Sequence, residues 1–85
     1  MELITTIKIG MGKARLTLDL GKPNSEQPLF MDWLADIGGT VLRIIAWKDE
    51  RGRIKPRGHA IEFESWADYE KGRPLRKVGI GFSRP

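Results

Sequence analysis

Hydrophobic and polar residues alternate near the start of the chain, and this alternation predicts a β-hairpin. Residues 14–20 are apolar at every even position and polar between them, and another largely apolar segment covers residues 3–9. Gly-Met-Gly-Lys separates the two at residues 10–13. Successive side chains of a strand point to opposite faces, so the pattern indicates two paired strands with one buried face. Residues 21–27 contain Gly, Pro, Asn and Ser and are expected to form an exposed loop.

The spacing of apolar residues changes after residue 27. They now recur at intervals of three and four, at Leu29, Phe30, Trp33, Leu34 and Ile37. Pro28 suits the first position of a helix, and Gly38-Gly39 can end one. The pattern predicts a short amphipathic helix over residues 28–37 that packs on the sheet, with Trp33 in the core.

A β pattern returns in the second half of the chain. Residues 41–47 are rich in β-branched and aromatic side chains, and Asp-Glu-Arg-Gly at residues 49–52 suits a type I turn whose glycine accepts positive φ. A return strand is expected over residues 53–63. Pro56 has no N–H to give to a ladder, so it predicts either an edge strand or a bulge near the middle of that strand.

The end of the chain predicts one more helix and one more strand. Ser65 suits a helix N-cap and Gly72 a stop, which indicates a helix over residues 66–71. Residues 75–82 alternate again and predict a last strand. We therefore expect a single α+β domain over residues 1–85, with the order ββαββαβ. It would hold a small antiparallel β-sheet with one or two short helices packed on one face.

The composition of the 85-residue chain excludes several classes of function. It is 40% hydrophobic and 31% charged, which is typical of a globular domain. The absence of cysteine removes disulfides, thiolate metal sites and thiol nucleophiles. No apolar run approaches the roughly 20 residues of a membrane span, and the N-terminus lacks the order of a signal peptide. We expect an intracellular, cytoplasmic protein with no role at a membrane.

Positive charge is concentrated in the second half of the chain. The net charge is +4, and residues 43–85 hold eleven Lys and Arg against six Asp and Glu. Five basic or titratable residues follow one another at a spacing of two: Arg51, Arg53, Lys55, Arg57 and His59. In one extended strand they would point the same way, about 6.6 Å apart. We call this set the basic row; its pitch suits the successive phosphates of an extended nucleic acid.

The sequence thus predicts a nucleic-acid-binding protein that is not an enzyme. The expected phosphate contacts are Arg51, Arg53, Lys55 and Arg57, with secondary contacts from Arg43, Arg76 and Lys77. Trp47 stands just before the turn and is expected to be exposed and to stack on a base. Neither predicted helix is basic, which favours single-stranded or structured nucleic acid over duplex DNA.

Two other interpretations stay open. The basic row would also protect an edge strand from pairing with another sheet. Alternatively, the protein is a small interaction or assembly factor of the phage or mobile-element type, which forms contacts or a homo-oligomer through sheet edges or an apolar patch.

Candidate catalytic residues are few. His59 is the single histidine and has no nucleophile or carboxylate at a recognisable spacing. Asp32 with Asp36, and Glu62 with Glu64, would each share a face, but no third metal ligand accompanies either pair. We therefore expect no catalytic residue, no cofactor and no metal.

One stretch of the chain resembles a known family. Residues 39–63 combine a Val-Leu strand, an aromatic residue before an Asp-x-x-Gly turn, and Lys-Pro at residues 55–56, with a tryptophan following at position 66. With a two-residue gap before the aromatic, this resembles the β-hairpin of the positive-cofactor-four family of single-stranded-DNA-binding transcriptional coactivators. The matching stretch does not include a counterpart of the long C-terminal helix through which that family dimerises. It implies a curved sheet that contacts single strands, here through Trp47, Arg53, Lys55 and Arg57.

Overall fold

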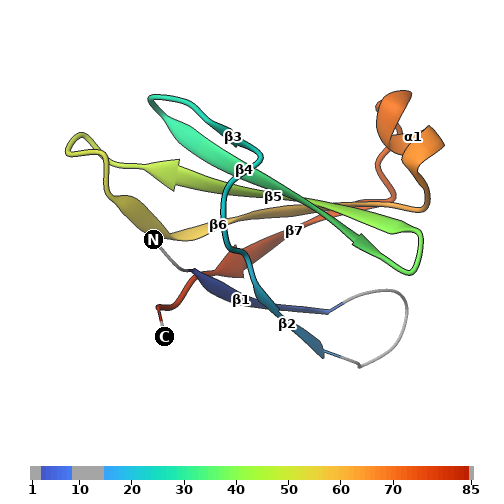
Figure 1. Ribbon diagram of the computed structural model, residues 1–85, viewed down its shortest axis with the longest axis horizontal. Coiled ribbons are helices and arrows are strands. Elements are labelled where there is room, and N and C mark those ends of the chain that lie inside the picture. The colour runs from blue at the N-terminus through green and yellow to red at the C-terminus, as the bar shows by residue number, and fades with distance from the viewer. Residues whose placement is uncertain (1–2, 9–14, 85) are drawn as a thin grey trace.

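The computed structural model describes residues 3–8 and 15–84 and shows a mostly antiparallel β fold with one short helix among them (Figure 1). A two-stranded sheet pairs β1 (Ile4–Lys8) with β2 (Arg15–Asp19). The helix α1 (Trp66–Glu70) follows the fourth strand of the larger sheet. That five-stranded sheet runs in the order β3 (Ser25–Glu26), β4 (Phe30–Ile37), β5 (Thr40–Lys48), β6 (Ile54–Phe63) and β7 (Arg76–Gly81). The small α+β class with an antiparallel sheet is confirmed, but the element order in the described residues is ββββββαβ.

The predicted N-terminal hairpin pairing is confirmed. β1 pairs with β2 from Ile4 opposite Asp19 to Lys8 opposite Arg15. The turn expected at residues 10–13 lies outside the described residues. The loop expected at residues 21–27 contains the short strand β3.

The prediction of a helix over residues 28–37 is wrong, because residues 30–37 of this segment form the strand β4. Its apolar residues fit both periods, and the odd positions from Met31 to Ile37 form an unbroken apolar set on one face of a strand. Gly38 and Gly39 have φ angles of +60° and +94°. Two consecutive positive φ values suit a two-residue hairpin turn between antiparallel strands. The Gly-Gly pair therefore turns the chain from β4 into β5.

The core lies between the two sheets. Residues directly opposite each other in an antiparallel ladder share a face, so the register divides the larger sheet into two faces. Its inner face meets Leu3 and Ile7 of the N-terminal segment. The buried residues of the inner face are Met31, Trp33, Leu42, Ile44, Ala46, Ala60 and Ile80. A backbone bridge between Ile4 and Ser83 joins the two sheets at one margin.

The other side of the larger sheet, the outer face, is covered only in part by the described elements. By register it carries Phe30, Asp32, Leu34, Arg43, Ile45, Trp47, His59, Ile61 and Lys77. α1 covers one end, where the Tyr69 ring meets Phe63 at 5.2 Å between centroids. The predicted N-cap is confirmed, since Asp68 N donates to Ser65 Oγ at 3.1 Å. α1 and the β5–β6 turn lie at opposite ends of the molecule (Figure 1).

β6 contains the bulge that Pro56 predicts. Ala46 lies opposite Gly58 and Lys48 opposite Ile54, so one residue of β5, Trp47, spans the three residues 55–57 of β6. Pro56 has no N–H to place in the ladder, while its carbonyl accepts a hydrogen bond from Phe82 N at 3.0 Å. The alternative of an edge strand is wrong, because β6 pairs with both β5 and β7.

Asp36 links α1 to the β4–β5 turn, and we expect this link to depend on pH. Hydrogen bonds from Trp66 Nε1, at 2.7 Å, and from Gly39 N hold the pKa of Asp36 below its ordinary value of 3.8. A carboxyl whose pKa is lowered by folding stabilises the fold above its unfolded pKa, and this contribution is lost as the pH falls through the lowered pKa. In NMR, the Trp66 indole N–H signal should titrate below pH 3.8.

The Asp36→Asn variant is the control for this titration. It keeps an acceptor oxygen but has no ionisable group, so the Trp66 signal should not respond to acid. A titration at or above pH 3.8 in the unmodified protein would contradict the expected stabilisation of the carboxylate.

Candidate nucleic-acid interface

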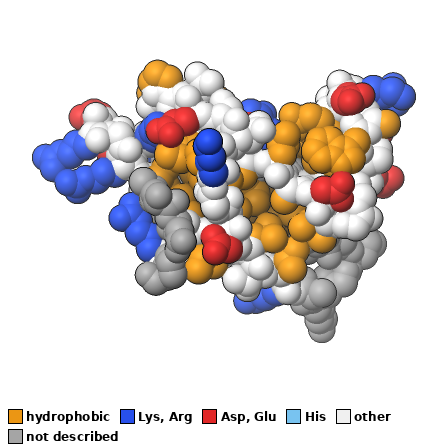
Figure 2. Space-filling model, in the orientation of Figure 1, with side chains coloured by type: hydrophobic (Ala, Val, Ile, Leu, Met, Phe, Trp, Pro, Cys, Tyr) orange, Lys and Arg blue, Asp and Glu red, His pale blue; other side chains and the backbone are white. Residues whose placement is uncertain are grey.

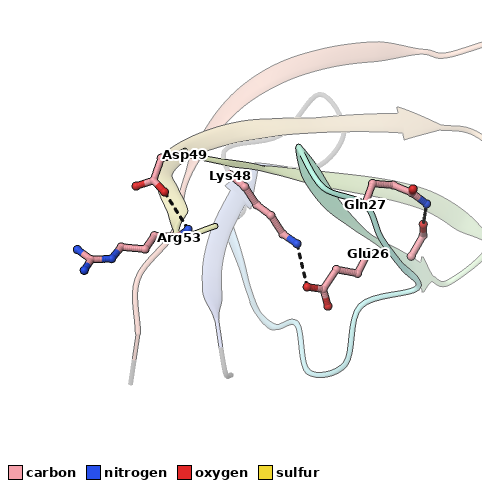
Figure 3. Close-up of polar contacts among 6 residues, drawn as sticks. Glu26, Gln27, Lys48, Asp49 and Arg53 are labelled. Carbon is pink, nitrogen blue, oxygen red and sulfur yellow. Dashed lines mark hydrogen bonds and ion pairs between the residues drawn. The ribbon is translucent and has the colours of Figure 1, made fainter. Parts of the chain in front are cut away.

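The β5–β6 turn is held by its first residue. Asp49 Oδ1 accepts hydrogen bonds from Arg51 N and Arg53 N, each at 2.9 Å, and Gly52 N donates to Asp49 O at 3.0 Å. Gly52 has a φ of +76°, as the turn prediction requires. Figure 3 shows the Arg53 side chain extending away from the sheet while its backbone N–H points at Asp49.

Four basic side chains surround this turn and the bulge that follows it. We name them the basic tip: Arg51, Arg53, Lys55 and Arg57. All four are exposed, and within the described part of the chain none has an ion-pair partner within 4 Å. Lys48 differs, because its Nζ lies 2.8 Å from Glu26 Oε2 and its side chain is only 10% exposed (Figure 3). Lys and Arg side chains project at this end of the molecule in Figure 2.

The basic row does not form one unbroken line. The positive φ of Gly52 places Arg51 in the turn, and the bulge at residues 55–57 interrupts the alternation of β6. Only Arg57 and His59 belong to the regular ladder with β7, where they lie opposite Gly81 and Gly79. The even pitch expected from the sequence is therefore lost, and the charges form a cluster.

Protection of an edge strand does not explain the charge of Arg57. Edge strands expose unpaired N–H and C=O groups, which charged side chains keep from joining another sheet. Arg57 lies opposite Gly81 in the ladder between β6 and β7, so this interpretation is wrong for Arg57, whereas Lys55 precedes that ladder.

Trp47 is exposed, as expected, and lies at the bulge beside the basic tip. Trp47 as a whole residue is 38% exposed. The indole meets Phe30 at 5.8 Å and His59 at 6.3 Å between ring centroids, both edge-on. Its Nε1 donates to His59 Nδ1 at 3.3 Å. His59 thus orients Trp47, and these three aromatic rings form one group on the outer face.

The secondary contacts expected from the sequence are dispersed. Arg43 lies on the outer face, but its Nε donates to Asp32 Oδ2 at 2.9 Å. Arg76 pairs with Glu62 on the inner side of the sheet, at 3.3 Å between Nε and Oε1. Lys77 is exposed on the outer face, opposite Ile61. Of these three, Lys77 is exposed and has no ion-pair partner within 4 Å among residues 3–8 and 15–84, as a phosphate contact requires.

Neither acidic pair forms a joint site. Asp32 is buried against Arg43, Asp36 binds Trp66, and Glu62 is buried against Arg76. Residues 3–8 and 15–84 contain no group of three or more His, Cys, Asp or Glu placed to hold a metal ion.

Phe30 and His59 are members of this site whose place beside Trp47 the sequence analysis missed. The helix prediction assigned Phe30 to the apolar stripe of residues 28–37, whereas in β4 it lies opposite Trp47. The sequence feature that indicates this arrangement is Gly38-Gly39. A hairpin turn at that point brings the two strands into register and places these aromatic residues together.

Comparisons with known proteins give no family for this chain. No helix in the described ranges is long and apolar enough to cross a membrane. No protein-family model, no curated protein and no solved structure matches the chain.

Proposed function

We propose that this protein binds single-stranded or structured nucleic acid, without catalysis, through the basic tip and Trp47. The observation that carries the proposal is the position of four exposed side chains without ion-pair partners in the described residues, beside an exposed tryptophan on the same hairpin. Phosphates are bound by Lys and Arg with release of counterions, and unpaired bases stack on aromatic rings. The partial resemblance of residues 39–66 to single-strand-binding coactivators points to the same ligand.

A single strand suits this arrangement better than a duplex. α1 is a five-residue helix whose sequence includes Asp68 and Glu70, so it supplies no basic helix for a major groove. A tryptophan can stack only on a base that is unstacked from its neighbours in the strand, and single strands contain such bases.

Removing basic-tip charges should weaken oligonucleotide binding and reduce its dependence on salt. Each lost phosphate contact lowers the slope of log K against log salt by about 0.7 for a single strand. The variant Arg53→Ala/Lys55→Ala should therefore lose roughly 1.4 from that slope if both side chains contact phosphate. The measurement is fluorescence anisotropy of a labelled oligonucleotide at two or more salt concentrations.

The double variant Lys71→Ala/Arg73→Ala is a matched control. It removes the same charge from exposed residues that follow α1, at the opposite end of the sheet from the basic tip. Its affinity should fall less, and its salt slope should stay near that of the unmodified protein. Absence of binding at low salt, or equal losses in the two variants, would refute the proposed interface.

A second candidate function is assembly through protein contacts. The observation that favours it is the exposure of Trp66 and Leu75, at 41% and 45%, near α1. An apolar area is visible there in Figure 2. Light scattering separates the two candidates: a stable oligomer that ignores oligonucleotides would favour assembly.

A further inference from the structure

An open pocket lies on the outer face next to Trp47. Its volume is about 560 Å³, and its lining residues are Ser25, Gln27, Pro28, Leu29, Phe30 and Arg43. Pockets of roughly 300–1,000 Å³ are typical of sites for small organic groups. Phe30 lines this pocket, and its ring meets Trp47 at 5.8 Å between centroids.

The lining combines apolar walls with a few polar groups. Leu29 is 70% exposed, and with Pro28 and Phe30 it forms the apolar part. Gln27 Nε2 donates to Ser25 Oγ at 2.9 Å, so the amide and hydroxyl are held together at the rim. A nucleobase presents apolar faces and an edge of donors and acceptors, and this lining offers partners for both.

Asp32 holds the charged group of the pocket in place. Its Oδ2 accepts from Arg43 Nε, and its side chain is only 6% exposed while that of Arg43 is 34% exposed. The guanidinium is thus tied to a buried carboxylate at one nitrogen and remains partly accessible. Arginine N–H groups commonly pair with the acceptor atoms of bases, above all with O6 and N7 of guanine.

The pocket adjoins the basic tip through one shared residue. Leu29 also lines a hollow whose other residues are three cations and two acids: Lys48, Arg51 and Lys55 with Asp49 and Glu50. The two hollows thus meet at Leu29, which gives a strand on the basic tip a short path to the pocket. We infer that the pocket receives one unstacked base of the bound strand, an inference that rests on the proposed nucleic-acid binding.

The test separates contacts to bases from contacts to phosphates. Two ligands of equal length are used, a thymidine oligonucleotide and an abasic deoxyribose-phosphate oligomer. The Leu29→Ala variant should bind the oligonucleotide about fivefold more weakly than the unmodified protein and the abasic oligomer equally well. Leu29 is exposed, so this change should leave the fold intact. Leu75→Ala, which removes another exposed leucine beyond α1, should change neither affinity.

The other outcomes separate the base pocket from nucleic-acid binding itself. If Leu29→Ala weakens the binding of both ligands equally, or of neither, the base pocket is refuted while nucleic-acid binding stands. The same holds if the unmodified protein binds both ligands with equal affinity. If it binds neither at low salt, the proposed function fails and the pocket assignment fails with it.

Discussion

Replacing Gly58 with alanine should unfold the protein or leave it marginally stable. A Cβ at this position would overlap the backbone carbonyl oxygen of Ile45 and would lie 2.6 Å from Cε2 of Phe82. The first neighbour belongs to the central strand β5 and cannot rotate away. Overpacking usually costs about 1–3 kcal/mol, and a clash with the backbone of a central strand should reach the upper end or exceed it. Urea denaturation followed by tryptophan fluorescence measures the loss.

Gly79→Ala is the matched control for this change. Gly79 lies on β7, one strand away from Gly58, and apart from its own atoms and its two chain neighbours no atom of the described chain lies within 4 Å of the position its Cβ would take. Alanine loses less backbone entropy than glycine, so this variant should match or exceed the original stability by up to about 0.5–1 kcal/mol. Similar losses in both variants would show that the close approach at Gly58 is not the cause.

Replacing Arg43 with methionine should destabilise the fold by about 3–5 kcal/mol. Asp32 is 4% exposed, and Arg43 is its ion-pair partner at 2.9 Å. The other oxygen, Asp32 Oδ1, is buried and has no hydrogen-bond partner within residues 3–8 and 15–84. Without Arg43, the carboxylate would remain in a low-dielectric site with nothing to balance its charge. Denaturant unfolding at neutral pH gives the size of the effect.

The opposite substitution should cost less, because the two partners differ in exposure. In Asp32→Asn, the Arg43 side chain, already 34% exposed, can turn to water, so we expect a loss of about 1–2 kcal/mol. The double variant Asp32→Leu/Arg43→Met should lie near the original stability, since a buried ion pair can be exchanged for apolar groups at little cost. Equal losses in the two single variants would contradict this account.

The candidate site was predictable as far as it depends on local sequence. Arg51 and Arg53 are exposed as expected because a tight turn places them at an end of the sheet, and Trp47, close to that turn, remains partly exposed. The neighbours of Trp47 and the ion pair of Arg43 were not predictable. Both depend on the register of β4 against β5, whereas the spacing of apolar residues in the β4 segment predicts a helix.

The sequence alone determined the features that short-range sterics and hydrogen bonds control. Gly52 has the positive φ that its turn requires, Ser65 caps α1, and Pro56 lies in a bulge because it lacks an N–H. The alternation in residues 15–19 likewise yields β2, whose partner is β1.

Only the tertiary structure decided the state of residues 28–37. Their apolar positions fit a helix and a strand alike, so local preference leaves the choice open. β5 is the central strand of the larger sheet, and its backbone needs hydrogen bonds on both sides. β4 pairs with one side of it from Thr40 to Trp47. That pairing also decided which residues meet on the outer face. It brought Phe30 to Trp47 and Asp32 to Arg43, contacts that no local pattern contains.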